Sequence, residues 1–549
     1  MLGTVRRGTR WLLYQSGWEW LLLVLLAGAA PFLVYYNLEY NPRPWHDEGS
    51  YLSLAKTISD DGVYAIRNSV GYQTLGAVQS VGPTVIVPIA LSFKLFGAGL
   101  VQGRLVTATF ALLTLVFFFG CGLKMFGRRT GLLAVVFLLS SPAASFLLYG
   151  RPAFGEIPAF GFMLAGWYLW ASAVQSSRRW LYVAAGLLVG AAMVTKTQYI
   201  VVGFGTLALL TLLDLVYYRQ GRFGSLIVVG LIAGGCVAAW WVWQVAYFGM
   251  ATFQDNAAKL AVLARSTMGF NLRNTIEAVK SLVGSGFGYF YFFWGFLALI
   301  YGGALCLPRT RDSLTRAFLW LFAAIWLCYY TFWIIPWSRY FFPTAALTAF
   351  FVAKLCVDFA AGLAASGQEL WSELRQFGRG RVDLSSKALI SLGTLTGLLT
   401  LGLLTGYQLQ RTIRFDVLDR VGEVPVYFVS PPQLGSPEQV AAFLNKTVAK
   451  EAVIETWERE LSILTEHRYH FPDPSILAHA QLFVYRGGQR DYALSADYFN
   501  QIRPDYVVVG WYARFNQIYD EEFLAQHGKL IGSIGDGEWR YDVYELHLQ

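Results

Sequence analysis

Apolar stretches of about 20 residues recur along most of this chain and alternate with short polar connections. An apolar helix of about 20 residues is long enough to cross a bilayer, so each stretch predicts a membrane span. The pattern as a whole predicts a polytopic α-helical membrane protein. We expect about eleven transmembrane helices, over residues 18–36, 102–123, 131–148, 156–174, 180–195, 199–217, 224–248, 283–306, 316–334, 341–361 and 388–406.

Basic residues follow these spans in an order that predicts their orientation. Three arginines, Arg6, Arg7 and Arg10, precede the first span, so the N-terminus is expected in the cytoplasm by the positive-inside rule. Every second connection should then be basic, and each of them is. They carry Lys124, Arg128 and Arg129; Arg178 and Arg179; Arg219 and Arg222; Arg309, Arg311 and Arg316; and Arg375, Arg379, Arg381 and Lys387.

The chain after residue 407 changes character, because charged residues and prolines return and the apolar runs shrink to strand length. Such runs lie at 424–429, 452–455 and 505–509. Ser436 with Gln439 three positions later is a capping-box pattern, which predicts a helix over 436–450. We therefore expect two domains, a transmembrane domain over 1–407 and an extracytoplasmic α/β domain over 408–549.

The composition agrees with this class and excludes others. Hydrophobic residues make up 55% of the 549 positions and charged residues only 14%, which exceeds the apolar content of a soluble domain. The net charge of +8 comes from short basic clusters between spans, so it reports topology and no nucleic acid partner is expected. The five cysteines lie in or beside predicted spans and provide no disulfide framework.

An adjacent pair of carboxylates, Asp47 and Glu48, follows the first span in the extracytoplasmic connection 37–101. Apolar residues at helical spacing come next and end at Asp60-Asp61-Gly62, which predicts an amphipathic helix on the membrane interface. The positive N-terminal end of that helix favours the charged acids. The pair either caps the helix or carries chemistry.

Further charges fall at the same boundary of the membrane. Glu156 follows the third span, with Arg151 close enough in sequence for a local ion pair. Arg104, Lys196 and Arg339 lie at that level too, where snorkelling is the alternative explanation for each. A carboxylate can take a proton from a hydroxyl group, and cations can bind a phosphate that leaves. Together these residues point to glycosyl transfer from a polyprenyl-phosphate sugar.

At these positions the chain resembles the membrane glycosyltransferases of the GT-C fold, close to the protein O-mannosyltransferases and the lipid A aminoarabinose transferase. The resemblance covers roughly residues 20–360. It depends on His46-Asp47-Glu48-Gly49-Ser50-Tyr51, Gly103-Arg104-Leu105, the segment 151–158, Thr195-Lys196, and Ser338-Arg339-Tyr340 with Pro343.

The resemblance implies an inverting transfer in which Asp47 is the general base. Glu48 and Glu156 would hold the acceptor or the donor sugar. It further implies a polyprenyl-phosphate sugar as donor and a glycan, lipid or protein as acceptor. The compact size and the absence of long repeat modules favour a prokaryotic inner membrane as the location. The donor phosphate would face Arg104, Lys196 and Arg339, and the substrates would be lined by His46, Tyr51, Arg151 and Tyr340.

Three alternatives stay open at this point. Related oligosaccharyltransferases use a divalent metal with an Asp-x-Asp pattern, whereas this chain offers Asp-Glu, so no metal is expected, with Mg²⁺ or Mn²⁺ as the alternative. The connection 249–282 is either a mobile cover over the site or an ordinary amphipathic connector. The rival functions are a flippase or transporter of polyprenyl-linked sugars and a non-catalytic assembly subunit.

Overall fold

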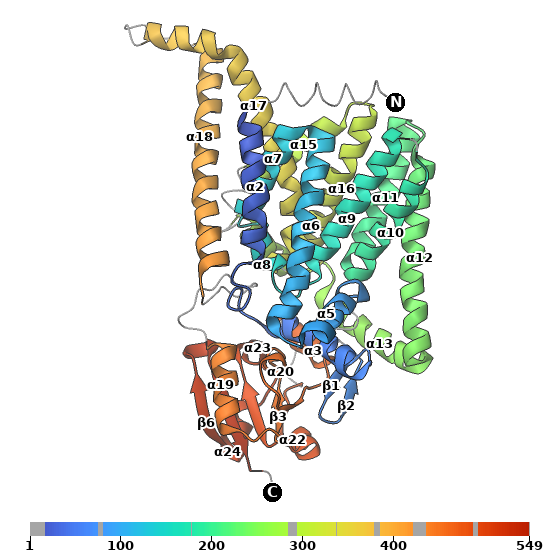
Figure 1. The fold of residues 1–549 in the computed structure, drawn as a ribbon, viewed down its shortest axis with the longest axis vertical. Coiled ribbons are helices and arrows are strands. Elements are labelled where there is room, and N and C mark those ends of the chain that lie inside the picture. Colours follow the sequence, from blue (N-terminus) through green and yellow to red (C-terminus); the bar gives the residue numbers. More distant parts are fainter. Residues whose placement is uncertain are drawn as a thin grey trace.

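The computed structural model describes residues 17–74, 81–176, 178–283, 294–335, 337–377, 385–420, 435–486 and 492–547. Long helices form one bundle, and a smaller domain that contains a sheet lies against one end of it (Figure 1). Within the described residues, eight helical segments are long and apolar enough to cross a membrane. They are α2 (Gly17–Tyr35), α6 (Leu100–Phe126), α9 (Glu156–Ser176), α11 with η1 (Gln198–Tyr218), α12 (Phe223–Phe248), α16 (Arg311–Phe332), the span Arg339–Ser366 within η3 (Ser338–Phe341) and α17 (Phe342–Phe377), and α18 (Ser386–Thr412) with η4 (Ile413–Leu418).

The described residues contain three shorter apolar helices as well: α5 (Pro83–Phe96), α10 (Trp180–Thr195) and α15 (Phe296–Cys306). The predicted span 131–148 is broken, because α7 (Arg128–Ser140) ends before Pro142 and α8 (Phe146–Gly150) follows. The residue before a proline avoids the helical conformation, which explains the break. Helix α5 lies inside the connection 37–101, where no apolar helix was predicted.

The core of the bundle is packed with aromatic rings. Trp167 of α9 stacks on Phe318 of α16 with ring centroids 3.7 Å apart. Phe118 of α6 stacks on Phe350 of α17 at 4.0 Å. Helices α6, α9, α16 and α17 therefore form the centre, while α12 and α18 keep most of their apolar side chains on the outside, as lipid-facing helices do.

Three of the basic connections, those with Arg129, Gln220 and Arg309, lie at one end of the bundle, as the alternation in the sequence requires. The predicted basic residues before residue 17 and at positions 379 and 381 lie outside the described residues. Arg129 Nε lies 2.8 Å from Glu19 Oε1 of α2, and Arg316 Nε donates to the carbonyl oxygen of Met125 at 3.0 Å. Gln220 donates to the carbonyl oxygen of Arg309, again at 3.0 Å. The opposite end carries the connection 37–101 and the smaller domain (Figure 1).

The connection 37–101 folds into helix α3 (His46–Asp61), a hairpin of β1 (Ile66–Asn68) and β2 (Gly71–Gln73), and α5. The predicted helix after the acidic pair is confirmed, and Gly62 ends it in the left-handed conformation, with φ 71°. Its position differs from the prediction. Helix α3 is buried between α5, α6 and the smaller domain instead of lying on the membrane interface.

The smaller domain, here called the sheet domain (residues 435–547), has five strands in the order β4-β3-β5-β7-β6. Strand β3 (Val453–Thr456) is parallel to β4 (Arg468–His470) and β5 (Tyr506–Val509), so Ile454 pairs with Tyr469 and Tyr506. Strand β7 (Tyr541–Leu546) runs antiparallel to β5 and to β6 (Gly528–Ile534). The helices are α19 (Pro437–Thr447), α20 (Leu461–Leu464), α21 (Ile476–Arg486), α22 (Ala496–Ile502), α23 (Trp511–Phe515) and α24 (Glu521–His527), with the turn η5 (Gly537–Trp539).

The predicted α/β character of this domain is confirmed. The capping box forms at Ser436 and Gln439, and β3 and β5 lie where strands were predicted. The predicted strand 424–429 lies outside the described residues. The predicted domain boundary at 407 falls inside a helix, because α18 and η4 continue to Leu418.

The connection 249–282 is helical. It consists of α13 (Met250–Thr267) and α14 (Leu272–Val283), and Lys259 of α13 forms an ion pair with Asp473 of the sheet domain at 3.1 Å. This connection is therefore helical and contacts the sheet domain, and its role as a mobile cover over the site stays a prediction.

Gly49 of α3 allows the closest approach between the transmembrane part and the sheet domain. A Cβ atom at Gly49 would lie 2.2 Å from the backbone nitrogen of Glu460. Gly49→Ala should therefore push α3 away from the sheet domain and lower the free energy of unfolding by roughly 1–3 kcal/mol. The midpoint of thermal unfolding in detergent measures this. Gly205→Ala is the control, because no atom lies within 4 Å of that Cβ position; equal midpoints for the two variants would contradict the packing described here.

Candidate active site

The two acids at the start of α3 point in different directions. Successive residues on a helix are about 100° apart, so adjacent carboxylates do not share a face. The Glu48 side chain is only 1% exposed, whereas the Asp47 side chain is 21% exposed. Asp47 is therefore the acid of the pair that a substrate can reach.

Glu48 is held in a buried clamp. Arg104 of α6 donates to both of its carboxylate oxygens, at 2.7 and 2.5 Å, and donates also to the carbonyl oxygen of Leu38 at 2.7 Å. The backbone N–H of Ala153 donates to Glu48 Oε1 at 2.9 Å. The pair joins the end of α2, the start of α3, α6 and the turn before α9. Arg104 is fully enclosed and its charge is already compensated.

Arg151, like Arg104, is buried and binds backbone carbonyl oxygens. It donates to the backbone carbonyl oxygens of Tyr36 and Asp416, which ties the end of α2 to η4. Its own carbonyl oxygen accepts from the Thr107 hydroxyl at 3.0 Å. The local ion pair with Glu156 that the sequence allowed does not form between these two residues.

The remaining predicted residues meet in a second cluster, which we call the charge cluster: Asp47, Glu156, Lys196 and Arg339. Lys196 Nζ lies 3.0 Å from Glu156 Oε1. Arg339 forms an ion pair with Asp47, and its Nε lies 3.8 Å from Glu156 Oε1. Helix α3, the start of α9, the turn between α10 and α11, and η3 each contribute one residue.

Aromatic rings surround these charges. The Arg339 guanidinium lies 5.3–5.6 Å from the ring centroids of Trp45, Phe154, Trp337 and Tyr340. Lys196 lies 5.9 Å from the ring of Tyr51. Cations over aromatic faces are stabilised by the ring electrons, and the rings also exclude water. The low local dielectric strengthens every charge interaction in the cluster.

The electrostatics set the protonation state of Asp47. Burial by itself would raise the pKa of this carboxyl group, but Arg339, His46 and Lys196 outweigh it, so the pKa lies below its ordinary value. The His46 pKa falls to about 4, first because the ring is buried and then because Arg459 is nearby. At neutral pH Asp47 is therefore ionised beside an uncharged imidazole.

The charge cluster has hydrogen-bonding capacity to spare. Among the described residues, Glu156 Oε2 and Arg339 Nε are buried without a hydrogen-bond partner, whereas Glu156 Oε1 has the Lys196 ammonium at 3.0 Å. A cavity of about 10 Å³, bounded by Glu156, Lys196, Arg339 and aromatic side chains, lies beside them. That volume is about the size of one water molecule, so a sugar needs a local opening to reach Glu156.

The sheet domain contributes a segment that the sequence analysis did not identify, residues 457–460, directly after β3. His46 Nδ1 lies 2.6 Å from the carbonyl oxygen of Trp457, and the two rings stack. Arg459 is buried and lies within electrostatic range of Asp47. The signal was present as a run of charged residues, Glu458, Arg459 and Glu460, at the carboxyl end of a strand, where α/β sheets often carry functional groups.

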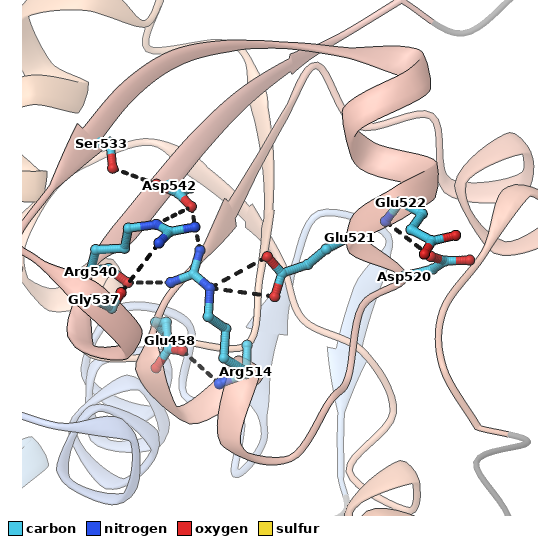
Figure 2. Close-up of polar contacts among 10 residues, drawn as sticks. Glu458, Arg514, Asp520, Glu521, Glu522, Ser533, Gly537, Arg540 and Asp542 are labelled. Atoms are coloured by element: carbon cyan, nitrogen blue, oxygen red, sulfur yellow. Dashed lines mark hydrogen bonds and ion pairs between the residues drawn. The ribbon is translucent and has the colours of Figure 1, made fainter.

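A network inside the sheet domain holds this segment in place. Figure 2 shows Arg514 between Asp542 and Glu521, with Arg540 and Ser533 also bound to Asp542. The backbone N–H of Ala513 donates to Glu458 at 2.9 Å, and Tyr541 donates to Glu460 at 3.1 Å. Burial raises the pKa of Glu458 to about 7. Contacts of Glu458 and Glu460 with other parts of the sheet domain thus hold the segment in place.

The donor set does not fit a divalent cation. Asp47 is paired with Arg339, Glu156 with Lys196, and Glu48 with Arg104, so each acid already has a positive partner. Within the described residues no three potential metal ligands of the His, Cys, Asp and Glu type come together. A hard cation needs several oxygen ligands at once, and this arrangement does not supply them.

Comparisons with known proteins bear on the fold that carries this site. Residues 80–243 match the family model described as dolichyl-phosphate-mannose-protein mannosyltransferase. The structure is similar to ArnT from Cupriavidus metallidurans in the apo state, with a TM-score of 0.60, 15% identity, and coverage of 96% of this chain and 97% of that chain. The same protein bound to undecaprenyl phosphate matches with a TM-score of 0.55, 15% identity and coverage of 96% and 98%.

A third match is the archaeal oligosaccharyltransferase AglB from Archaeoglobus fulgidus in complex with an inhibitory peptide and a dolichol-phosphate. Its TM-score is 0.55 at 11% identity, and the match covers 94% of this chain and 73% of that chain. No curated protein sequence matches the chain. The chain has the GT-C fold of membrane glycosyltransferases, and the fold predicted from the acidic pair and its neighbours is confirmed. It is an integral membrane protein.

The buried clamp generates a prediction on stability. Arg104→Met should leave the Glu48 carboxylate buried without a partner and lower the free energy of unfolding by about 3–5 kcal/mol. The double variant with Glu48→Gln removes the stranded charge, so it should regain a large part of that loss. Thermal unfolding of the purified variants measures both. An Arg104→Met protein as stable as the wild type would show that the clamp does not hold the connections together.

Proposed function

We propose that the protein is an inverting glycosyltransferase that moves a sugar from a polyprenyl-phosphate donor to a hydroxyl group of an acceptor. The observation that carries the proposal is the pairing of the accessible carboxylate Asp47 with Arg339, next to Lys196 and Glu156. The GT-C fold and the undecaprenyl phosphate and dolichol-phosphate of the similar structures support it. The acceptor is a glycan, a lipid or a protein.

In the proposed reaction Asp47 takes the proton of the acceptor hydroxyl. The acceptor oxygen forms a bond to the anomeric carbon while the bond between that carbon and the phosphate oxygen breaks. The electron pair of the broken bond leaves with the lipid phosphate, whose added charge Arg339 and Lys196 stabilise. A single displacement inverts the anomeric centre, and no second carboxylate nucleophile is needed.

The ion pair between Arg339 and Asp47 links donor binding to base strength. In the free protein Arg339 keeps the pKa of Asp47 low, which makes this carboxylate a weak base. When the donor phosphate engages Arg339, part of that stabilisation is withdrawn from Asp47, so its proton affinity rises. The base is then strongest when the donor is in place, which limits the side reaction with water.

The other predicted residues divide into two groups in this proposal. Glu156 accepts a hydrogen bond from a sugar hydroxyl group, because its Oε2 has no hydrogen-bond partner in the described part of the chain. Glu48, Arg104 and Arg151 are positioning residues, since Glu48 and Arg104 bind each other and both arginines donate to backbone carbonyl oxygens. The role of Arg104 as a phosphate ligand stays a prediction.

We propose further that transfer needs no divalent metal, since the cations Lys196 and Arg339 stand where a metal would compensate the phosphate. The location that fits is a prokaryotic inner membrane, with the N-terminus in the cytoplasm and the sheet domain outside, because the basic connections gather at the end away from the sheet domain. Charges at one end of the bundle do not favour a flippase, whose substrate site lies near the middle of the membrane.

Asp47→Asn should lower the rate of sugar transfer by about 10²–10⁴-fold, because the amide cannot accept the proton. Donor binding should persist. Purified wild type and variant are incubated, with EDTA present, with radiolabelled polyprenyl-phosphate sugars and a membrane extract, and transfer of label is followed. Asp60→Asn is the matched control, an exposed acid at the other end of α3. Transfer by Asp47→Asn at the wild-type rate would contradict the proposal, and failure of wild type in EDTA with recovery in Mg²⁺ or Mn²⁺ would contradict metal independence.

Lys196→Met should raise the KM for the donor about 10–100-fold, the effect of losing a charge-assisted hydrogen bond to the phosphate. Lys196→Arg keeps the charge and should restore most of the affinity. Donor titrations of both variants are compared with Lys94→Met, which removes an exposed lysine from α5. Thermal unfolding is measured alongside, because Glu156 loses its partner in the methionine variant. An unchanged KM in Lys196→Met would remove Lys196 from the phosphate site.

A further inference from the structure

A polar cleft of about 390 Å³ opens between the β1–β2 hairpin, α13 and the sheet domain. We call it the hairpin cleft. It is lined by Gln73 and Tyr72 of the hairpin, Asp255 and Lys259 of α13, and Phe471 and Asp473 of the sheet domain, among others. None of these residues belongs to the charge cluster, and the cleft is far larger than the cavity beside Glu156.

The charges of the hairpin cleft compensate one another within its wall. Lys259 Nζ lies 3.1 Å from Asp255 and 3.1 Å from Asp473. Two carboxylates against one ammonium leave the cleft with no excess of positive charge. A phosphate or another anion gains no net attraction from these three side chains, whereas neutral hydroxyl groups can accept from the lysine and donate to the carboxylates.

The lining of the hairpin cleft combines an aromatic ring with polar groups, which favours a sugar as the ligand. The Tyr72 side chain is 53% exposed, so its ring offers an apolar face next to the polar groups. Asn256, which also lines the cleft, uses its amide NH₂ group on Thr74 at 3.2 Å. A few convergent polar groups beside an aromatic ring are the features that orient a small polar ligand.

Arg459 lies behind the lining of the hairpin cleft, against Gln73 and Phe471. This residue donates to the Gln73 side-chain oxygen at 2.6 Å and lies 5.1 Å from the ring centroid of Phe471. Burial lowers the pKa of Arg459 to about 10, and Asp47 and Asp473 are near enough to oppose that shift. Arg459 is 3% exposed, and in the part of the chain that the structure describes its Nε has no hydrogen-bond partner. A buried guanidinium with an unused donor thus contacts two residues of the cleft lining and lies within electrostatic range of the proposed base.

We propose that the hairpin cleft is the acceptor site, that it binds the acceptor as a neutral glycan, and that Arg459 is the positioning residue that brings a glycan hydroxyl to Asp47. The inference rests on the proposed glycosyl transfer and adds the class of acceptor to it. An anionic lipid head group and a peptide are the acceptors that it disfavours.

Binding is measured directly, so that the inference is tested apart from the reaction. The full-length Asp47→Asn protein in nanodiscs is titrated with mannotriose, maltotriose and chitotriose, and with glucose 1-phosphate as the anionic probe. We expect at least one trisaccharide to bind, and the double variant Tyr72→Ala and Asp255→Asn to weaken that binding about tenfold or more. Both side chains are exposed, so folding should be retained. Tyr407→Ala, an exposed tyrosine on α18, is the control.

Three results would overturn the inference: no binding of any trisaccharide, unchanged binding by the double variant, or tighter binding of glucose 1-phosphate than of the trisaccharides. Release of lipid phosphate from radiolabelled donor by the wild type is followed in parallel and tests the proposed function by itself. Donor turnover with no glycan binding would contradict the assignment of the hairpin cleft as the acceptor site, and the proposed glycosyltransferase function would be unaffected.

The positioning role of Arg459 has its own readout. Arg459→Gln should raise the KM for the glycan acceptor about tenfold or more and leave the KM for the donor unchanged. The acceptor KM of Arg459→Lys should lie between those of the wild type and of Arg459→Gln. A residue that only supports the fold would change both constants or lower the midpoint of thermal unfolding. An unchanged acceptor KM in a folded Arg459→Gln protein would contradict the assignment.

Discussion

Compensation of buried charge is the constraint on which the rest of this structure depends. Ionised groups at the end of an apolar bundle are costly unless each has a partner. The chain meets this demand with two sets of ion pairs, the clamp of Glu48 with Arg104 and the cluster of Asp47, Glu156, Lys196 and Arg339. The first set is complete and inaccessible. The second is incomplete, because Glu156 and Arg339 keep unused hydrogen-bonding groups, and this incompleteness makes it the place for a substrate.

The clamp and the cluster depend on each other through helix α3. Glu48 fixes the start of the helix to α6 and to the turn before α9, and the next residue toward the N-terminus, Asp47, is then aimed at Arg339. The absence of a side chain at Gly49 lets the backbone of the sheet domain pack against the same turn of helix α3. Three consecutive residues therefore face three different parts of the molecule, and each of them constrains where the proposed base can lie.

The sequence predicted the elements well where one physical signal dominates. Apolar length predicted most spans, basic connections predicted which helix ends lie together, and the capping box at Ser436 predicted α19. It failed where two signals compete. Pro142 interrupts a stretch whose hydropathy continues, and α5 is an apolar helix too short to stand out as a span. The connection 249–282 has the polarity of a loop, yet its apolar residues at helical spacing make it two helices.

The sequence by itself determined that this is a membrane protein of the GT-C fold, and that acids and cations gather at one end of its bundle. These properties follow from apolar length, the alternation of basic connections and the order of short motifs. Tertiary structure alone decided which acid is accessible, because Asp47 and Glu48 are adjacent and chemically similar and differ only in what surrounds them. It also brought Arg459 from the far end of the chain to Asp47. No local pattern encodes such a contact, since it arises from how a distant domain packs on α3.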